Sequence, residues 1–205
     1  MMGISRWVAG RGRPGAAVMA GLALLAGGCA WAQPRFGPER TGFNPLEDQI
    51  GVGNVAQLGL QWQAELPSRG KDVLVTDGLV IVAGQALGTG GAGLVTALDE
   101  GTGEERWTVA VPPPTCNQSC FGAETRIASA DGLVFVATEV AGQFGTLAAL
   151  DAHTGDLVRT YATAATAAPA VSGGRVYAAT LAPEGVVVEA WDVASGASVW
   201  RTEPA

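Results

Sequence analysis

The chain has 205 residues, of which 48% are hydrophobic and only 15% are charged, and it contains 30 glycines. This composition is typical of an all-β domain with many turns. Because 19 acidic residues stand against 12 basic residues and a single histidine, the sequence argues against a nucleic-acid partner and indicates a solvated acidic surface.

The N-terminal segment has the features of a secretory signal peptide. Arg6, Arg11 and Arg13 form a positive start, and the following apolar stretch, 16–26, is too short to span a membrane comfortably. Ala30-Trp31-Ala32 is a small-x-small cleavage site. We therefore predict cleavage after Ala32 and export to the periplasm or the medium.

Lipidation at Cys29 is the alternative processing event. The residues Ala26-Gly27-Gly28-Cys29 are a variant of a lipobox, with alanine in the place where leucine is stronger. In that case the protein would be membrane-anchored. With residues 1–32 assigned to the leader, residues 33–60 form an extended, turn-rich N-terminal segment.

The segment Gln61–Leu66 alternates polar and apolar residues and predicts the first β-strand. Beyond it, three glycine-containing pairs each lead into an apolar run, as hairpin turns do. These pairs are Asp77-Gly78, Asp131-Gly132 and Gly173-Gly174.

A second motif also occurs three times, and in each copy a hydrophobic run ends in Asp and a short loop ends in Gly. Asp accepts backbone N–H bonds in such a loop, and Gly supplies a positive φ, so each copy predicts a corner between two antiparallel strands. The copies are Asp99 to Gly103 followed by Trp107, Asp151 to Gly155 followed by Val158 in the place of Trp, and Asp192 to Gly196 followed by Trp200.

Together the two motifs predict three repeats of four strands, at about residues 71–111, 124–163 and 167–202. Four short strands per repeat, arranged radially, form the blade of a β-propeller. Since propellers typically need about 4–8 blades, we expect an all-β partial propeller that is truncated or is completed by a second copy. The domain of interest is thus 61–205.

The pattern A-[LW]-D-x-x-[TS]-G…W resembles the repeat of the PQQ-like (quinoprotein-type) β-propellers, over roughly Trp62 to Thr202. In closed propellers of this family a leading strand such as 61–66 commonly completes the last blade, and an ordinary edge strand is the alternative. The fixed place of Trp107 and Trp200 predicts that they pack between neighbouring blades. For each of these tryptophans, replacement by Ala should destabilise the fold by about 3–5 kcal/mol.

The resemblance leaves three functions open. The first is a non-catalytic exported propeller that acts as a scaffold or binding surface, without a cofactor and with an unidentified protein partner. The second is a fragment of a PQQ-dependent dehydrogenase, which would need PQQ, Ca²⁺ and a carboxylate base. The third is an outer-membrane-assembly propeller lipoprotein, which would require acylation of Cys29.

Cys116 and Cys120 lie four residues apart in the segment between the first two predicted blades. In an exported protein a disulfide is the default for such a pair. The spacing is not the C-x2-C of thioredoxin-like sites, and no second Cys pair accompanies it. We therefore predict a structural disulfide rather than a redox or metal site.

Any ligand site is expected on the innermost strands, which line the central channel. The candidates there are Lys71, Asp72, Glu124, Thr125, Arg126 and Thr166. His153 falls inside the second corner, where exposure is the expectation. The sequence shows no nucleophilic triad and no metal-ligand spacing, and we predict no catalytic, cofactor-binding or metal-binding residue.

Overall fold

The structure is a computed structural model of the whole chain. It describes residues 31–33, 35–36, 39–45, 50–87, 92–111, 124–140, 143–161, 163, 165–183 and 185–202. Cys29, Cys116 and Cys120 lie outside the described residues, so the lipidation site and the disulfide stay predictions.

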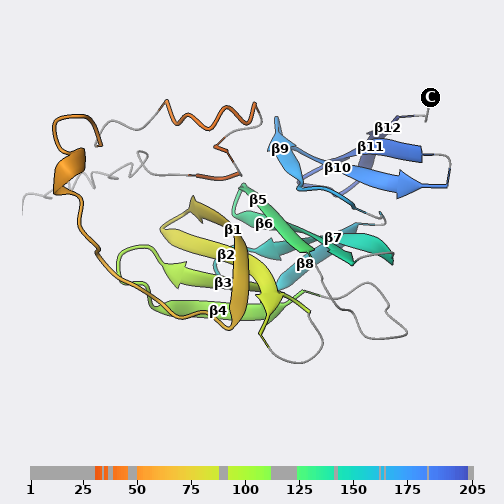
Figure 1. Cartoon of the computed structure of the whole chain (residues 1–205). Helices are drawn as coiled ribbons and strands as arrows, with labels where there is room; N and C mark the ends of the chain where they lie inside the picture. The colour runs from red at the N-terminus through yellow and green to blue at the C-terminus, as the bar shows by residue number, and fades with distance from the viewer. Residues whose placement is uncertain are drawn as a thin grey trace, which may run out of the picture.

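The described residues form three four-stranded antiparallel sheets, each a simple up-and-down meander (Figure 1). Sheet 1 contains β1 (Ser68–Thr76), β2 (Leu79–Ala86), β3 (Gly93–Asp99) and β4 (Glu105–Ala110). Sheet 2 contains β5 (Glu124–Ala130), β6 (Leu133–Val140), β7 (Gln143–Asp151) and β8 (Leu157–Tyr161). Sheet 3 contains β9 (Ala170–Ser172), β10 (Arg175–Ala182), β11 (Gly185–Asp192) and β12 (Ser198–Arg201).

The predicted fold class, an all-β partial propeller of three blades, is confirmed by this arrangement. A short 3-10 helix, η1 (Val55–Gln57), precedes the sheets. No helix among the described residues is both long and apolar enough to cross a membrane.

The hairpins between the first two strands of each blade follow from their turn residues. Asp77 and Gly78 both have positive φ, at 51° and 74°, and Asp131 and Gly132 repeat these values at 52° and 74°. Two consecutive positive φ angles define the type I′ turn, whose twist matches that of the flanking strands. The turn residues thus set the register in which Thr76 faces Leu79.

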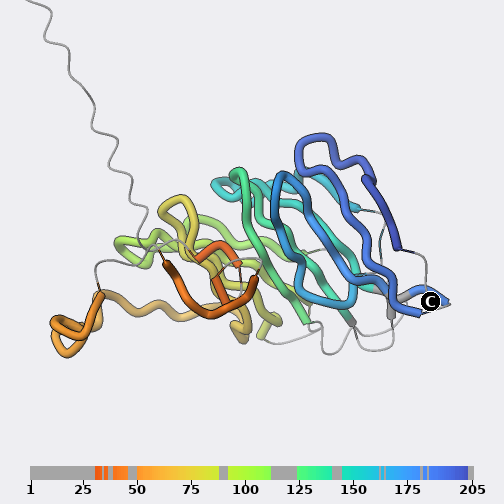
Figure 2. The backbone as a smooth tube through the Cα atoms, turned by 90° about the horizontal axis from the view of Figure 1, so that it is seen from above, coloured from red at the N-terminus to blue at the C-terminus, as the bar shows by residue number. Residues whose placement is uncertain are grey.

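The three sheets lie side by side, with sheet 2 in the middle (Figure 2). The core consists of two layers of buried side chains, one on each side of sheet 2. Between sheets 1 and 2 lie buried aliphatic side chains such as Ile81, Val95 and Ile127. Between sheets 2 and 3 the packing is more aromatic, with Tyr161 tilted against Trp191 at a centroid distance of 5.5 Å. The blades are therefore held together by side chains that project from their faces, as in a propeller.

The Asp–Gly corner has the same geometry in each blade. The Asp99 carboxylate oxygen Oδ1 accepts the N–H groups of Gly101 and Thr102 at 3.0 and 2.9 Å. A hydrogen bond from the Arg106 guanidinium, together with those from Thr102, holds the pKa of Asp99 at about 2. Asp151 and Asp192 accept corner N–H groups in the same way.

Each corner is capped by a side chain from the chain segment that precedes the blade, which is a strand for blades 2 and 3 and the extended segment around Trp62 for blade 1. Trp107 Nε1 donates to the carbonyl of Ala152 at 3.0 Å, and its ring packs on Gly155, where a Cβ would lie 2.8 Å from the indole. Trp62 makes the same contact with Glu100 and Gly103, at 2.8 Å from Nε1 to the carbonyl. The corner glycine is thus required for two reasons, its positive φ and the close approach of the capping side chain.

At the third corner the capping residue is Arg159, which corrects the expectation that Val158 stands in the place of Trp. The register pairs Ala149 with Arg159, as it pairs Ala97 with Trp107. The same bulge follows both pairs, and Arg159 stands four residues after Gly155 just as Trp107 stands four residues after Gly103, so the equivalent position is Arg159 and not Val158.

The structure places Trp107 in the predicted contact between blades and Trp200 outside it. Trp107 is 8% exposed, whereas Trp200 is 40% exposed and its ring lies 6.0 Å from that of Tyr177 in its own blade. The segment Gln61–Leu66 was expected to be a strand, but it is not assigned as one and is not part of a described sheet. Exposed and half-buried residues still alternate along this segment, and Trp62 is one of the half-buried residues.

Three consecutive residues near the N-terminus, Trp31 to Gln33, touch the innermost strand of every blade, and we call them the tie (Figure 1). Trp31 exchanges two backbone hydrogen bonds with Val75 of β1, at 2.8 and 3.0 Å. The Ala32 carbonyl accepts the N–H of Ser129 of β5 at 2.8 Å. The Gln33 amide, 5% exposed, pairs with both backbone groups of Val171 of β9, at 2.7 and 3.1 Å.

The position of Trp107 predicts a large effect of its removal. Trp107→Ala should lower the free energy of unfolding by about 3–5 kcal/mol, because it empties a buried interface and leaves a carbonyl unpaired. Trp200→Ala is the matched control and should lower it by about 1 kcal/mol, since this ring is already partly exposed. Urea melts followed by circular dichroism measure both; equal losses would contradict the capping role of Trp107.

The tie predicts a local effect at a single amide. Gln33→Ala removes the acceptor of the Val171 N–H, which should then exchange with solvent about tenfold faster. Gln61→Ala is the control, because its Nε2 donates to the Gly101 carbonyl at an exposed position. Hydrogen exchange measured by NMR compares the two variants, and an unchanged rate at Val171 in Gln33→Ala would show that the side chain does not hold β9.

Candidate functional site

Four of the six predicted site residues meet where β1 and β5 lie side by side. Lys71 Nζ lies 2.8 Å from Glu124 Oε1, and the Arg126 guanidinium lies 2.9 Å from the other oxygen of Glu124. Arg126 also lies 3.6 Å from Asp72, which in turn accepts the N–H of Ile127 at 3.4 Å. These charges form one ion network that joins blade 1 to blade 2.

The network arises from matching positions on the two innermost strands. Residues two apart on a strand point to the same face, so Glu124 and Arg126 of β5 both reach the side chains of β1. The side chains of Lys71, Glu124 and Arg126 are 41–44% exposed. Because exposed ion pairs contribute little, we assign each pair about 0–1 kcal/mol of stability.

Glu124 is the carboxylate most strongly held by this network. The hydrogen bond from Lys71, followed by that from Arg126, lowers the pKa of Glu124 below its ordinary value. Lys71 is the only lysine in the sequence. The ion-pair partners of Asp72 and Glu124 are Lys71 and Arg126, which belong to this chain.

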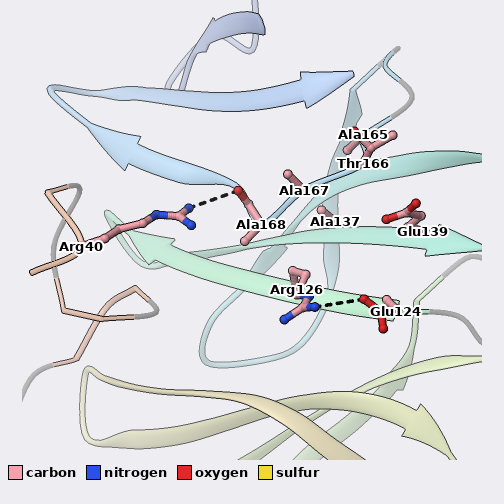
Figure 3. A pocket seen from close by; sticks show the side chains of 9 residues that line it. All are labelled: Arg40, Glu124, Arg126, Ala137, Glu139, Ala165, Thr166, Ala167 and Ala168. Carbon is pink, nitrogen blue, oxygen red and sulfur yellow. Dashed lines mark hydrogen bonds and ion pairs between the residues drawn. The ribbon is translucent and has the colours of Figure 1, made fainter. Parts of the chain in front are cut away.

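A pocket of about 290 Å³ opens beside the network, between blades 2 and 3 (Figure 3). Arg40 of the N-terminal segment lies on one side of it, and Glu139 of β6 on the other. The Arg40 guanidinium donates to the carbonyls of Ala168 and Pro169 at 3.3 and 3.4 Å. The pocket is lined by Arg40, Glu124, Arg126, Ala137, Glu139, Ala165, Thr166, Ala167 and Ala168.

The remaining two predicted residues separate. Thr166 lines the pocket and donates its hydroxyl to the carbonyl of Ala179 at 3.3 Å. Thr125 points the other way, toward blade 1, where a Cβ on Gly93 would lie 2.5 Å from its hydroxyl. Strand alternation explains this, since Thr125 stands between Glu124 and Arg126.

Sequence reasoning missed Arg40 and Glu139. Arg40 belongs to a turn-rich segment in which no periodicity marks a site, and Glu139 is one charged residue near the end of an apolar strand. His153 lies on the exposed face of its corner, where its backbone N–H donates to Asp151. Neither Arg40 nor Glu139 carried a sequence signal that pointed to the pocket.

The donor set at this site does not fit the Ca²⁺ ion that PQQ chemistry would require. The described residues contain no group of three or more His, Cys, Asp or Glu side chains placed to hold a metal ion. At the network, Asp72 and Glu124 already face Lys71 and Arg126. A cation bound there would have to displace these partners, so we derive no reaction step through PQQ or Ca²⁺.

Comparisons with known proteins agree with the repeat architecture. A family model described as outer membrane protein assembly factor BamB matches residues 91–205. The search of curated proteins found no match.

Solved propellers superimpose on the chain. A europium-containing methanol dehydrogenase matches with a TM-score of 0.64 and 21% identity, over 85% of this chain and 32% of its own. The quinohemoprotein alcohol dehydrogenase of Comamonas testosteroni matches with a TM-score of 0.61 and 27% identity, over 84% and 27%. BamB from Moraxella catarrhalis matches with a TM-score of 0.51 and 21% identity, over 70% and 39%. The chain thus spans between 27% and 39% of the length of these structures.

The ion network predicts how Glu124 titrates. Lys71→Met should raise the pKa of Glu124 toward its ordinary value, because the largest cause of its lowering is removed. Arg69→Met is the control, since Arg69 is an exposed residue of the same strand without an ion pair among the described residues. Carboxyl-detected NMR titration measures the shift, and an equal pKa in both variants would contradict the pairing.

The same titration sets the sign of the pH dependence. Because folding lowers the pKa of Glu124, the network stabilises the fold above the unfolded-state pKa near 4.5. This contribution is lost as the pH falls through the folded-state pKa. Lys71→Met should therefore flatten the acid limb of the stability curve, while Arg69→Met should leave it unchanged.

Proposed function

Because this chain belongs to the family of PQQ-like β-propellers, we propose that it is an exported, non-catalytic propeller that serves as a scaffold or binding surface. The observation that carries the proposal is the ion network, in which Lys71, Asp72, Glu124 and Arg126 neutralise one another across two blades. Groups used in acid–base chemistry need a free lone pair or proton directed at a substrate. Here the oxygens of Glu124 face Lys71 and Arg126, and Asp72 faces Arg126 and the N–H of Ile127.

The pocket beside the network supplies the binding surface in this proposal. It brings a guanidinium from Arg40, a carboxylate from Glu139 and a hydroxyl from Thr166 to one concave region. A few convergent polar groups in a hollow of this kind are the usual basis of recognition. A small polar molecule or a polar side chain of a partner protein would meet both signs of charge there.

A fragment of a PQQ-dependent dehydrogenase is the second candidate. Its support is the 27% identity with the alcohol dehydrogenase of Comamonas testosteroni over 84% of this chain. The carboxylates of the described residues argue against it, for the reason given above. Most ligands of a cofactor would then have to come from outside the described residues.

An envelope-assembly lipoprotein is the third candidate, and the family model described as BamB supports it. It would require acylation at Cys29, whereas free export would follow from cleavage at Ala32. Fold does not choose among the three, since one propeller architecture serves unrelated functions.

A cofactor titration tests the leading proposal. The chain contains six tryptophans, so bound PQQ should quench its fluorescence. We expect no saturable quenching when PQQ and Ca²⁺ are added at micromolar concentration, beyond the inner-filter loss seen with N-acetyltryptophanamide. Saturable quenching that also requires Ca²⁺ would favour the dehydrogenase candidate and remove the non-catalytic one.

A further inference from the structure

The tie lies on the innermost strands as a short extended peptide would. Strands β1, β5 and β9 each stand at the edge of their sheet, so one edge of each has no neighbouring strand in that sheet. Unpaired backbone groups at such an edge are a template for another chain segment. The tie pairs with these edges at Val75, Ser129 and Val171, and we call these three residues the seat.

The first two residues of the tie bind the seat through their main chain. Trp31 donates its N–H to the Val75 carbonyl and accepts the Val75 N–H. The Ala32 carbonyl accepts the N–H of Ser129 at 2.8 Å and its hydroxyl at 3.3 Å. The Trp31 ring packs on Phe36 of its own segment, at a centroid distance of 5.6 Å. Because every extended segment has these main-chain groups, they supply affinity without selecting a sequence.

The third position of the tie supplies selectivity. The Gln33 amide donates from Nε2 to the Val171 carbonyl at 2.7 Å and accepts the Val171 N–H on Oε1 at 3.1 Å. Only a side-chain amide offers a donor and an acceptor side by side in this way. A glutamate of the same shape would accept the N–H but would turn a carboxylate oxygen toward the Val171 carbonyl. Since Gln33 is 5% exposed, water does not replace the lost hydrogen bond, and the seat selects glutamine.

The chain's own segment occupies the seat at a conformational cost. Directly after the tie the backbone turns back, and the Phe36 N–H donates to the Gln33 carbonyl at 2.9 Å. This turn places Arg35 at a φ of 65° and Phe36 at a φ of 84°. Positive φ is unfavourable for residues with bulky side chains. A separate peptide that ends after its glutamine does not need this turn, so it can compete with the tie.

We propose that the seat is a binding site for an extended peptide of a partner protein, in which a glutamine side chain pairs with Val171 as Gln33 does. Residues 31–33 occupy this site in cis, and the site opens when they leave. The predicted cleavage after Ala32 would free the Val75 and Ser129 positions. The seat shares no residue with the ion network or with the lining of the pocket near Arg40, so this proposal does not depend on the function proposed above.

The probe for the test is a fluorescein-labelled peptide with the sequence of residues 30–35, and the protein is the full chain. In the unaltered chain the tie competes at an effective concentration in roughly the millimolar range, so the peptide should bind weakly. The double variant Trp31→Pro with Gln33→Ala removes a main-chain donor and the amide, which releases the tie. It should bind the peptide at least about tenfold more tightly than the unaltered chain, as measured by fluorescence anisotropy.

A peptide with glutamate in place of glutamine is the matched control, because it keeps the shape and loses the donor to the Val171 carbonyl. It should bind the double variant at least about tenfold more weakly than the glutamine peptide. Absence of saturable binding of the glutamine peptide to the double variant would overturn the proposal. Equal affinities of the two peptides would overturn it as well.

Gln33→Ala alone supplies the test if the double variant does not fold. In this variant the glutamine peptide, added at saturating concentration, should slow the exchange of the Val171 amide by about tenfold, because it restores the missing acceptor. Gln61→Ala is the control, since Gln33 still protects Val171 there and the peptide should not change its exchange. An exchange rate at Val171 that the peptide leaves unchanged in Gln33→Ala would contradict the proposal.

Discussion

The blade arrangement depends on one contact, in which a side chain from the segment before each blade caps the Asp–Gly corner of that blade. The cap donates to the carbonyl of the residue that follows the Asp, whether the donor is Trp62, Trp107 or Arg159. A Cβ on the corner glycine would clash with the cap at all three corners, so the cap packs directly against the corner backbone. Each blade therefore needs its neighbour to complete it, and Trp200 has no described corner to cap.

Much of this architecture could be predicted from sequence because its determinants are local. A type I′ turn needs two residues that tolerate positive φ, and Asp77-Gly78 or Asp131-Gly132 meet that need wherever they occur. The position of the cap is equally local, since Trp107 and Arg159 each stand four residues after their corner glycine, and the expectation of Val158 misplaced it by one residue. What the repeat pattern does not predict is that an arginine can take the place of the tryptophan and donate to the corner carbonyl.

At the candidate site, likewise, the sequence predicted which residues lie near the channel but not how their side chains pair. Strand order placed Lys71, Asp72, Glu124 and Arg126 near the channel, but only the offset between β1 and β5 determines that they neutralise one another. That offset depends on the packing of whole sheets, to which no short motif corresponds. Arg40 reaches the pocket from a segment without periodicity, so no sequence pattern predicted its place in the site.

The tie and the ion network contact the same two strands, β1 and β5, at successive positions along them. Because the tie includes Trp31 and Ala32, the position of leader cleavage determines which of its contacts remain. Along β1 the network residue Asp72 precedes Val75, and along β5 Arg126 precedes Ser129, so the tie crosses the strands beyond the network. Trp31 and Ala32 make two of the three tie contacts, and cleavage after Ala32 would remove both. The Gln33 amide would remain to hold β9 alone, leaving the edges of β1 and β5 to water. A processing site upstream of Trp31 would keep all three innermost strands joined, so the position of cleavage decides whether the tie belongs to the mature fold.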